Sequence, residues 1–68
     1  MLQGTVKWFN SDRGYGFITQ DEGGKDLFIH HTGIISKSNF ASLKDGQKVK
    51  YLVAQGNRGP YATHVSEL

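Results

Sequence analysis

The sequence predicts an all-β domain, a small barrel closed by five short strands. No window of useful length shows the 3.6-residue apolar period of a helix, and glycine interrupts most candidate segments. Strand-like segments instead recur at short, regular spacing. The chain also holds 9 Gly, 4 Phe, 3 Tyr, 1 Trp and 1 Pro, a composition that suits a tightly bent sheet.

The five expected strands are residues 4–10, 15–20, 26–31, 47–54 and 60–66. Turns rich in Gly, Asn and Asp separate them, and residues 32–46 are expected to form a polar loop with one helical turn near residues 32–35. An open meander of such strands would expose apolar edges. Closure into a five-stranded barrel of the OB or SH3-like type is therefore favoured.

Length and composition restrict the function. The 68 residues suffice for one small domain, residues 1–68, and leave no room for a multi-domain enzyme. The absence of Cys excludes disulfides and thiolate metal sites, and the net charge of +2 only leans toward polyanionic partners. No leader and no run of about 20 apolar residues is visible, so we expect a cytoplasmic protein without a membrane partner.

Side-chain alternation in the second and third strands predicts an aromatic outer face. Tyr15 and Phe17 share one face of the second strand, and Phe28 and His30 share one face of the third. The opposite faces carry the aliphatic residues expected in the core, namely Ile18, Leu27 and Ile29. An exposed aromatic face favours a binding site, and both stacked nucleobases and a protein partner suit it. The alternative is that the aromatic residues themselves form the core.

The segment Arg-Gly-Tyr-Gly-Phe-Ile, residues 13–18, matches most of the ribonucleoprotein motif of single-strand binders, although Gln20 replaces its final aromatic. In this interpretation Gly14 and Gly16 let a base approach the backbone. The two aromatic rings give the base platforms, and Arg13 reaches a phosphate.

Three motifs occur in order: Val-Lys-Trp-Phe-Asn at 6–10, the segment at 13–18, and Asp-Leu-Phe-Ile-His at 26–30. With Gly-Asn-Arg-Gly-Pro at 56–60, they make the chain closely similar to the bacterial cold-shock proteins over residues 1 to about 65. The resemblance implies a five-stranded antiparallel OB-type Greek-key barrel. It also implies sequence-tolerant binding of single-stranded RNA and single-stranded DNA on the face of the first three strands.

The resemblance also assigns site residues. The positions that it implies for base stacking are Trp8, Tyr15, Phe17, Phe28, His30 and Phe40, and His31, which replaces a frequent Phe, is added to them. The positions that it implies for polar or phosphate contacts are Lys7, Arg13, Asp26 and Arg58. Phe9 is expected to be peripheral.

Trp8 and Tyr61 each depart from a simple pattern. Strict alternation would place Trp8 beside the core residue Val6, so an outward Trp8 requires a bend or bulge in the first strand. Tyr61 stands where the family is often small or polar. It either adds a platform at the rim or packs on the barrel.

Metal binding and catalysis are not expected. His30 and His31, as adjacent strand residues, should point to opposite sides and are poorly placed to chelate one ion. No nucleophile elbow or phosphate-binding loop is present, so we expect no enzyme, no cofactor and no small-molecule substrate. The expected function is that of a monomeric, ATP-independent nucleic-acid chaperone that keeps RNA unstructured. The alternative is a protein-interaction module that uses the same aromatic face.

Overall fold

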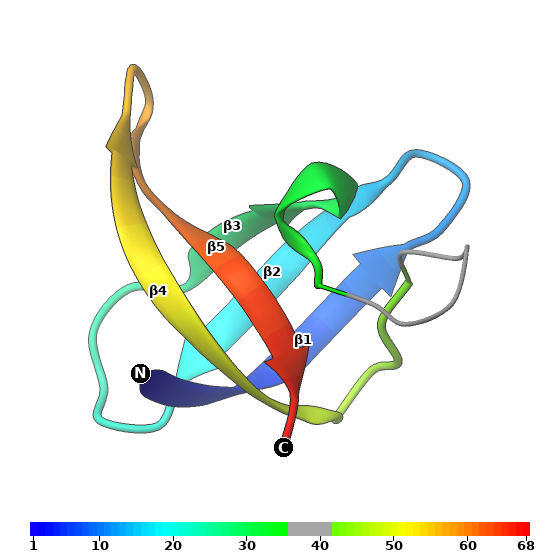
Figure 1. Cartoon of the computed structure of the whole chain (residues 1–68), viewed down its shortest axis with the longest axis horizontal. Helices are drawn as coiled ribbons and strands as arrows, with labels where there is room; N and C mark the ends of the chain where they lie inside the picture. The colour runs from blue at the N-terminus through cyan, green and yellow to red at the C-terminus, as the bar shows by residue number, and fades with distance from the viewer. Residues whose placement is uncertain (36–41) are drawn as a thin grey trace.

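Five strands surround a common interior in the computed structural model, which describes residues 1–35 and 42–68 (Figure 1). They are β1 (Leu2–Asn10), β2 (Tyr15–Gln20), β3 (Leu27–His30), β4 (Lys48–Gly56) and β5 (Gly59–Glu67). Each strand overlaps its expected segment, which confirms the all-β prediction. The expected helical turn is the short 3-10 helix η1 (His31–Gly33), so His31 lies outside the third strand.

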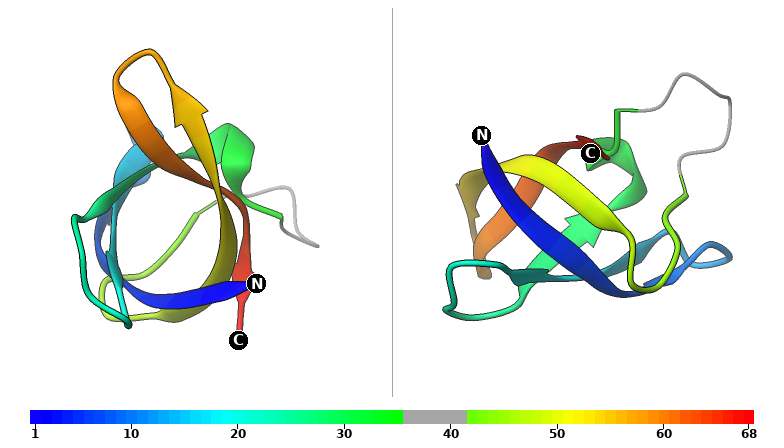
Figure 2. Two further views of the ribbon diagram at one scale, coloured as in Figure 1. Left: turned by 90° about the vertical axis from the view of Figure 1, so that its left-hand side faces the viewer. Right: turned by 90° about the horizontal axis from the view of Figure 1, so that it is seen from below.

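The strands pair in the order β1-β2-β3-β5-β4, and β4 returns to β1 to close the barrel (Figure 2, left). This confirms the five-stranded OB-type barrel. Four of the described seams are antiparallel, but β3 and β5 pair in parallel, with Phe28 opposite Tyr61. A closed ring of five strands cannot alternate in direction all the way round. The barrel is therefore antiparallel, as expected, at every described pairing except that of β3 with β5, where closure of the ring requires a parallel pair.

The barrel interior is filled mainly by aliphatic side chains. Ile18 and Ile29 are completely buried and Leu27 nearly so, as the alternation predicted. The buried cluster takes residues from every strand and one from the segment before β4, namely Val6, Ile18, Leu27, Ile29, Leu43, Val49, Tyr51, Ala62 and Val65. The interpretation in which the aromatic residues of β2 and β3 form the core is therefore wrong.

The turn between β1 and β2 is held by the side chain of Asn10. Its Oδ1 accepts hydrogen bonds from the backbone N–H groups of Asp12 and Arg13, each at 3.0 Å. Such an Asx turn replaces the hydrogen bonds that a strand would supply. Gly14 ends the turn with a φ of 75°, in the left-handed region that glycine adopts without steric cost. Arg13 is thereby held in the turn, two residues before β2 begins at Tyr15.

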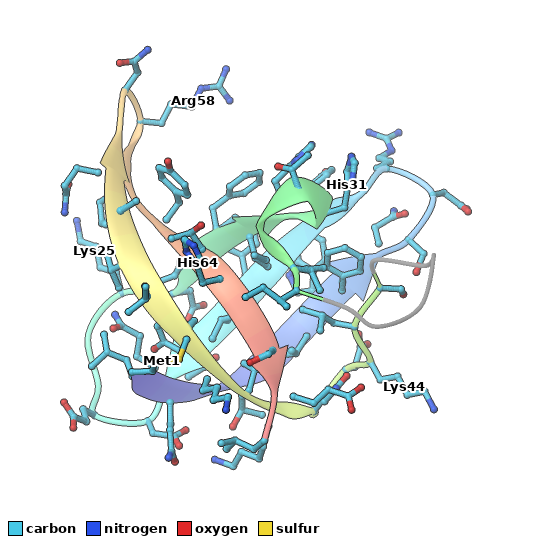
Figure 3. All side chains as sticks on the ribbon, in the orientation of Figure 1. Met1, Lys25, His31, Lys44, Arg58 and His64 are labelled. Atoms are coloured by element: carbon cyan, nitrogen blue, oxygen red, sulfur yellow. The ribbon has the colours of Figure 1, made fainter. Side chains whose placement is uncertain are left out.

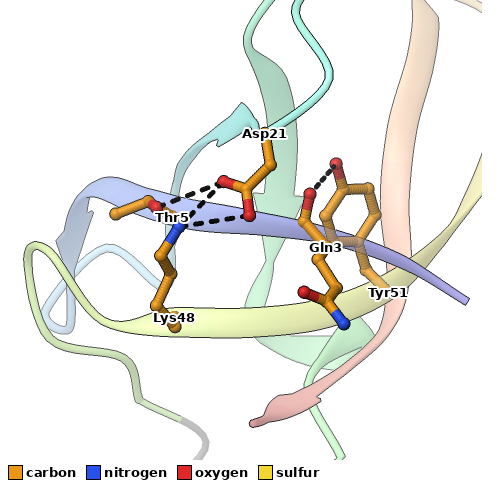
Figure 4. A network of polar contacts seen from close by, with 5 residues as sticks. All are labelled: Gln3, Thr5, Asp21, Lys48 and Tyr51. Carbon is orange, nitrogen blue, oxygen red and sulfur yellow. Dashed lines mark hydrogen bonds and ion pairs between the residues drawn. The ribbon is translucent and has the colours of Figure 1, made fainter.

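A polar network ties β1, β4 and the β2–β3 turn together (Figure 4). Lys48 Nζ lies 3.0 and 3.1 Å from the two carboxylate oxygens of Asp21, and Thr5 Oγ1 donates to the same carboxylate. The Tyr51 hydroxyl donates to the Gln3 carbonyl at 3.4 Å. Burial, with Asp21 and Glu22 as smaller causes, raises the pKa of Tyr51 above its ordinary value.

None of the helical structure within residues 1–35 and 42–68 is long and apolar enough to cross a membrane.

Candidate nucleic-acid interface

A bulge in β1 brings Trp8 onto the outer face. Val6 pairs with Ile18, but Trp8 pairs with Phe17, so that Lys7 is the extra residue on β1. Such a bulge reverses which residues face inward from that point on. Val6 is consequently buried, whereas Trp8 packs its ring on Phe17, with ring centroids 5.3 Å apart. The bulge inferred from the sequence is confirmed.

The aromatic rings of β1, β2 and β3 form one continuous outer surface, which we call the aromatic face. Neighbouring centroids lie 5.6 Å apart for Trp8–Tyr15, 5.9 Å for both Tyr15–Phe28 and Phe17–Phe28, and 6.5 Å for Phe28–His30. Tyr15 pairs with His30 and Phe17 with Phe28 across the β2–β3 seam, so register fixes these contacts. The face comprises Trp8, Tyr15, Phe17, Phe28 and His30. Each ring is half-buried or exposed, with Phe28 37% exposed.

His31 joins one end of this face, contrary to the expected alternation. Because η1 begins at His31, its ring lies beside that of His30, with centroids 4.3 Å apart. The ring also covers Gly14, where an added Cβ would lie 2.6 Å from His31 Cδ2. The backbone N–H of His31 donates to the Gly14 carbonyl at 2.8 Å. The prediction that the two histidines point apart is therefore wrong, because the strand ends between them.

The adjacency of the two rings does not build a metal centre by itself. In the part of the chain that the structure describes, no three or more His, Cys, Asp or Glu residues are grouped so that they could hold a metal ion. His30 Nδ1 is instead 3.0 Å from Thr32 Oγ1, within η1.

Glycine is required at position 16 for a reason other than the one inferred from the sequence. A Cβ at this position would strike the backbone carbonyl of Trp8 and would lie 3.0 Å from Phe9 Cδ1. Gly16 thus lets the bulged part of β1 lie close to β2. Phe9, expected to be peripheral, is partly buried and packs against the core. The interpretation of Gly16 as an opening for a base is replaced by one of strand packing.

Two of the four predicted polar residues are paired with each other. Lys7 Nζ lies 2.9 Å from the Asp26 carboxylate, and this hydrogen bond is the main cause that lowers the pKa of Asp26. Arg13 lies in the β1–β2 turn, and Arg58 extends from the tip of the β4–β5 hairpin (Figure 3). Neither arginine forms an ion pair with another described residue. These two cations are therefore available to an anionic ligand.

Two further aromatic residues, Phe40 and Tyr61, bear on the site. Phe40 lies outside the described residues, so its predicted place in the site stays a prediction. Tyr61 lies opposite Phe28 across the parallel seam and is 38% exposed. Sequence reasoning left its role open because β3 and β5 are distant in the chain. The sequence feature that could have pointed to Tyr61 is the presence of a large aromatic residue directly after Pro60, near the start of a strand.

The barrel and its aromatic face define a class: small OB-type domains with flat side chains exposed on adjacent strands. A family model described as "'Cold-shock' DNA-binding domain" matches residues 2–68. The chain therefore belongs to the cold-shock domain family, which is known for nucleic-acid binding.

Individual proteins agree with this assignment. The chain is 51% identical over 67 residues to "Cold shock-like protein CspG" of Escherichia coli, covering 98% of this chain and 94% of that protein. It is 52% identical over 68 residues to "Cold shock protein CspB" of Geobacillus stearothermophilus, covering all of both chains. The solved structure "drosophila Unr CSD456" superposes with a TM-score of 0.81 at 25% identity. That match covers 98% of this chain but only 26% of the longer one.

Proposed function

We propose that the protein binds single-stranded RNA and single-stranded DNA through the aromatic face and acts as an ATP-independent nucleic-acid chaperone. The observation that supports this most is the continuous run of rings from Trp8 through Phe17 and Phe28 to His30 on three adjacent strands. Membership of a family known for nucleic-acid binding supports the same ligand class.

The geometry favours unpaired bases over duplex. Flat rings offer a stacking surface, which contributes about 1–3 kcal/mol per base and tolerates any sequence. In a duplex the faces of the bases are already stacked on each other and are not accessible to the protein. A surface built from rings therefore discriminates by strandedness more than by sequence.

Polar groups around the face serve the backbone and the base edges in this proposal. Arg13 and Arg58 contact phosphates at two ends of the bound strand. Lys7 and Asp26 exchange their mutual ion pair for a phosphate and a base donor. That exchange costs little, because both side chains are partly exposed, at 56% and 34%, and exposed ion pairs contribute at most about 1 kcal/mol.

Remodelling of RNA then follows from mass action. The sequence carries no phosphate-binding loop motif of the nucleotide hydrolases. Binding the open strand but not the hairpin stabilises the open state by RT ln(1 + [L]/Kd), where L is the free protein. The protein acts as a monomer, each copy covering a short stretch.

The fluorescence of the single tryptophan, Trp8, provides the test. Titration with oligothymidine should quench it strongly, whereas a matched duplex should quench it weakly. A hairpin carrying a fluorophore and a quencher should also open on addition of protein without ATP. A protein-interaction module would show neither the quenching nor the preference for single strands, and that result would contradict the proposal.

A further inference from the structure

Tyr61 shares the outer surface with the aromatic face, although it belongs to β5. It is the parallel partner of Phe28, and partners in a sheet project their side chains to the same side. The two residues are exposed to nearly the same degree, at 38% and 37%. Their neighbours Ala62 and Ile29 are buried, as the alternation requires. The outer surface of rings therefore crosses the seam from β3 to β5.

The two partner rings turn in opposite directions. Phe28 leans toward β2, where its centroid lies 5.9 Å from those of Tyr15 and Phe17. Tyr61 leans toward β4, where a Cβ on Gly56 would lie 3.1 and 3.2 Å from two carbons of its ring. Among the ring pairs of the described residues, none includes Tyr61. Tyr61 is thus a separate platform and not a filler between the other rings.

The surroundings of Tyr61 suit one more nucleotide. Two carbons of its ring lie close to Gly56, where no side chain intervenes, and 38% of the residue remains exposed to a ligand. Its cross-strand partner on β4 is the small residue Ala54. Arg58 lies in the two-residue connection between Gly56 and Gly59, three residues before Tyr61 in the chain, and its cation extends from the tip of this hairpin (Figure 3). Neighbouring strands lie about 4.8 Å apart, a separation that one nucleotide unit can span.

We infer that Tyr61 forms an additional base-stacking subsite, one nucleotide beyond Phe28, with Arg58 contacting the phosphate of that nucleotide. This inference rests on the proposed function of the aromatic face. It assigns the protein a binding site that continues over the β3–β5 seam onto the β4–β5 hairpin.

A length series of oligothymidines tests the subsite. The affinities of the wild type, Tyr61→Ala and Tyr61→Phe are measured by Trp8 quenching for oligomers of increasing length. The affinity of the wild type should rise with oligomer length until the oligomer also fills the subsite at Tyr61. For oligomers of that length, the affinity of Tyr61→Ala should be lower than that of the wild type by about five-fold or more. On oligomers too short to pass Phe28, the two proteins should bind equally. Tyr61→Phe should keep the wild-type profile, since it keeps the ring.

Leu52→Ala is the matched control, because Leu52 is an exposed apolar residue of β4, at 43%, that the inference leaves outside the subsite. It should match the wild type at every length, and thermal melting confirms that each variant is folded. An equal loss for Tyr61→Ala at every length, or no loss at any length, would overturn the subsite. So would a Tyr61→Phe profile like that of Tyr61→Ala. A wild type that binds no oligothymidine would instead contradict the proposed function itself.

Discussion

Val6 and Trp8 are two residues apart on β1, yet one is buried in the barrel and the other lies on its outer surface. The extra residue between them, Lys7, shifts the register of β1 against β2. The same shift turns Phe9 toward the core, where it packs beside Gly16. A single bulge therefore places the Trp8 ring on the aromatic face and packs the Phe9 ring against the core.

Removal of a central ring should weaken binding and leave the fold intact. Phe17→Ala and Phe28→Ala should each reduce the free energy of oligothymidine binding by about 1–3 kcal/mol. Their rings lie on the outer face and contact other rings of that face, so the free energy of unfolding should change little. Titration by Trp8 fluorescence, combined with urea unfolding, separates the two effects. A variant that unfolds while its folded fraction binds normally would show that the ring serves the core.

Truncation inside the barrel should have the opposite effect. Ile18 and Ile29 are completely buried, and their replacement by Ala should lower the free energy of unfolding by about 2–5 kcal/mol. In a domain of this size that loss is a large fraction of the total stability. The measurement is urea or thermal unfolding, with Leu52→Ala as an exposed control. A melting temperature near that of the wild type would contradict this placement of the core.

Gly16→Ala distinguishes strand packing from access for a base. The new methyl group would meet the backbone of β1 at Trp8 and Phe9, which cannot move without distorting the bulge. The free energy of unfolding should fall by about 3 kcal/mol or more. Gly23→Ala is the control: it meets no atom within 4 Å and adds only the strain of a φ of 92°. If Gly16→Ala is instead as stable as the wild type but binds oligothymidine poorly, the glycine is needed for access of a base and not for strand packing.

The salt dependence of binding should be shallow. Each phosphate neutralised on a single strand contributes about −0.7 to the log–log slope. Arg13 and Arg58, together with Lys7 once it leaves Asp26, neutralise three phosphates and predict a slope of about −2.1. Lys7→Ala removes one of these contacts and should make the slope shallower by about 0.7. A wild-type slope steeper than about −4 would mean that lysines far from the aromatic face dominate binding.

Alkaline pH should destabilise the fold through Tyr51. Burial raises the pKa of its hydroxyl in the folded state, so above about pH 10 the unfolded chain binds fewer protons than the folded one. The free energy of unfolding therefore falls as the pH rises through this range, while the contribution is fully present at neutral pH. The free energy of unfolding is measured by urea between pH 8 and pH 11 for the wild type and for Tyr51→Phe. The difference between the two proteins at each pH reports the ionisation of Tyr51, because both proteins carry the same lysines. A difference independent of pH would contradict the assignment.

The sequence alone determined the barrel and most of the aromatic face, because both depend on local alternation. Tyr15, Phe17 and Phe28 follow the two-residue period of strands, and the short β2–β3 connection, residues 21–26, sets their register. Trp8 needed the family resemblance, since a bulge breaks that period within one strand.

Only the tertiary structure decided the relationships that depend on where strands end and which strands meet. His31 joins His30 because β3 ends between them, and Gly16 is needed because β1 lies directly over it. Tyr61 reaches Phe28 only across the parallel seam, between residues distant in the chain. The parallel direction of that seam follows from the closure of five strands into a ring. It is a property of the whole barrel, and no single segment of sequence carries it.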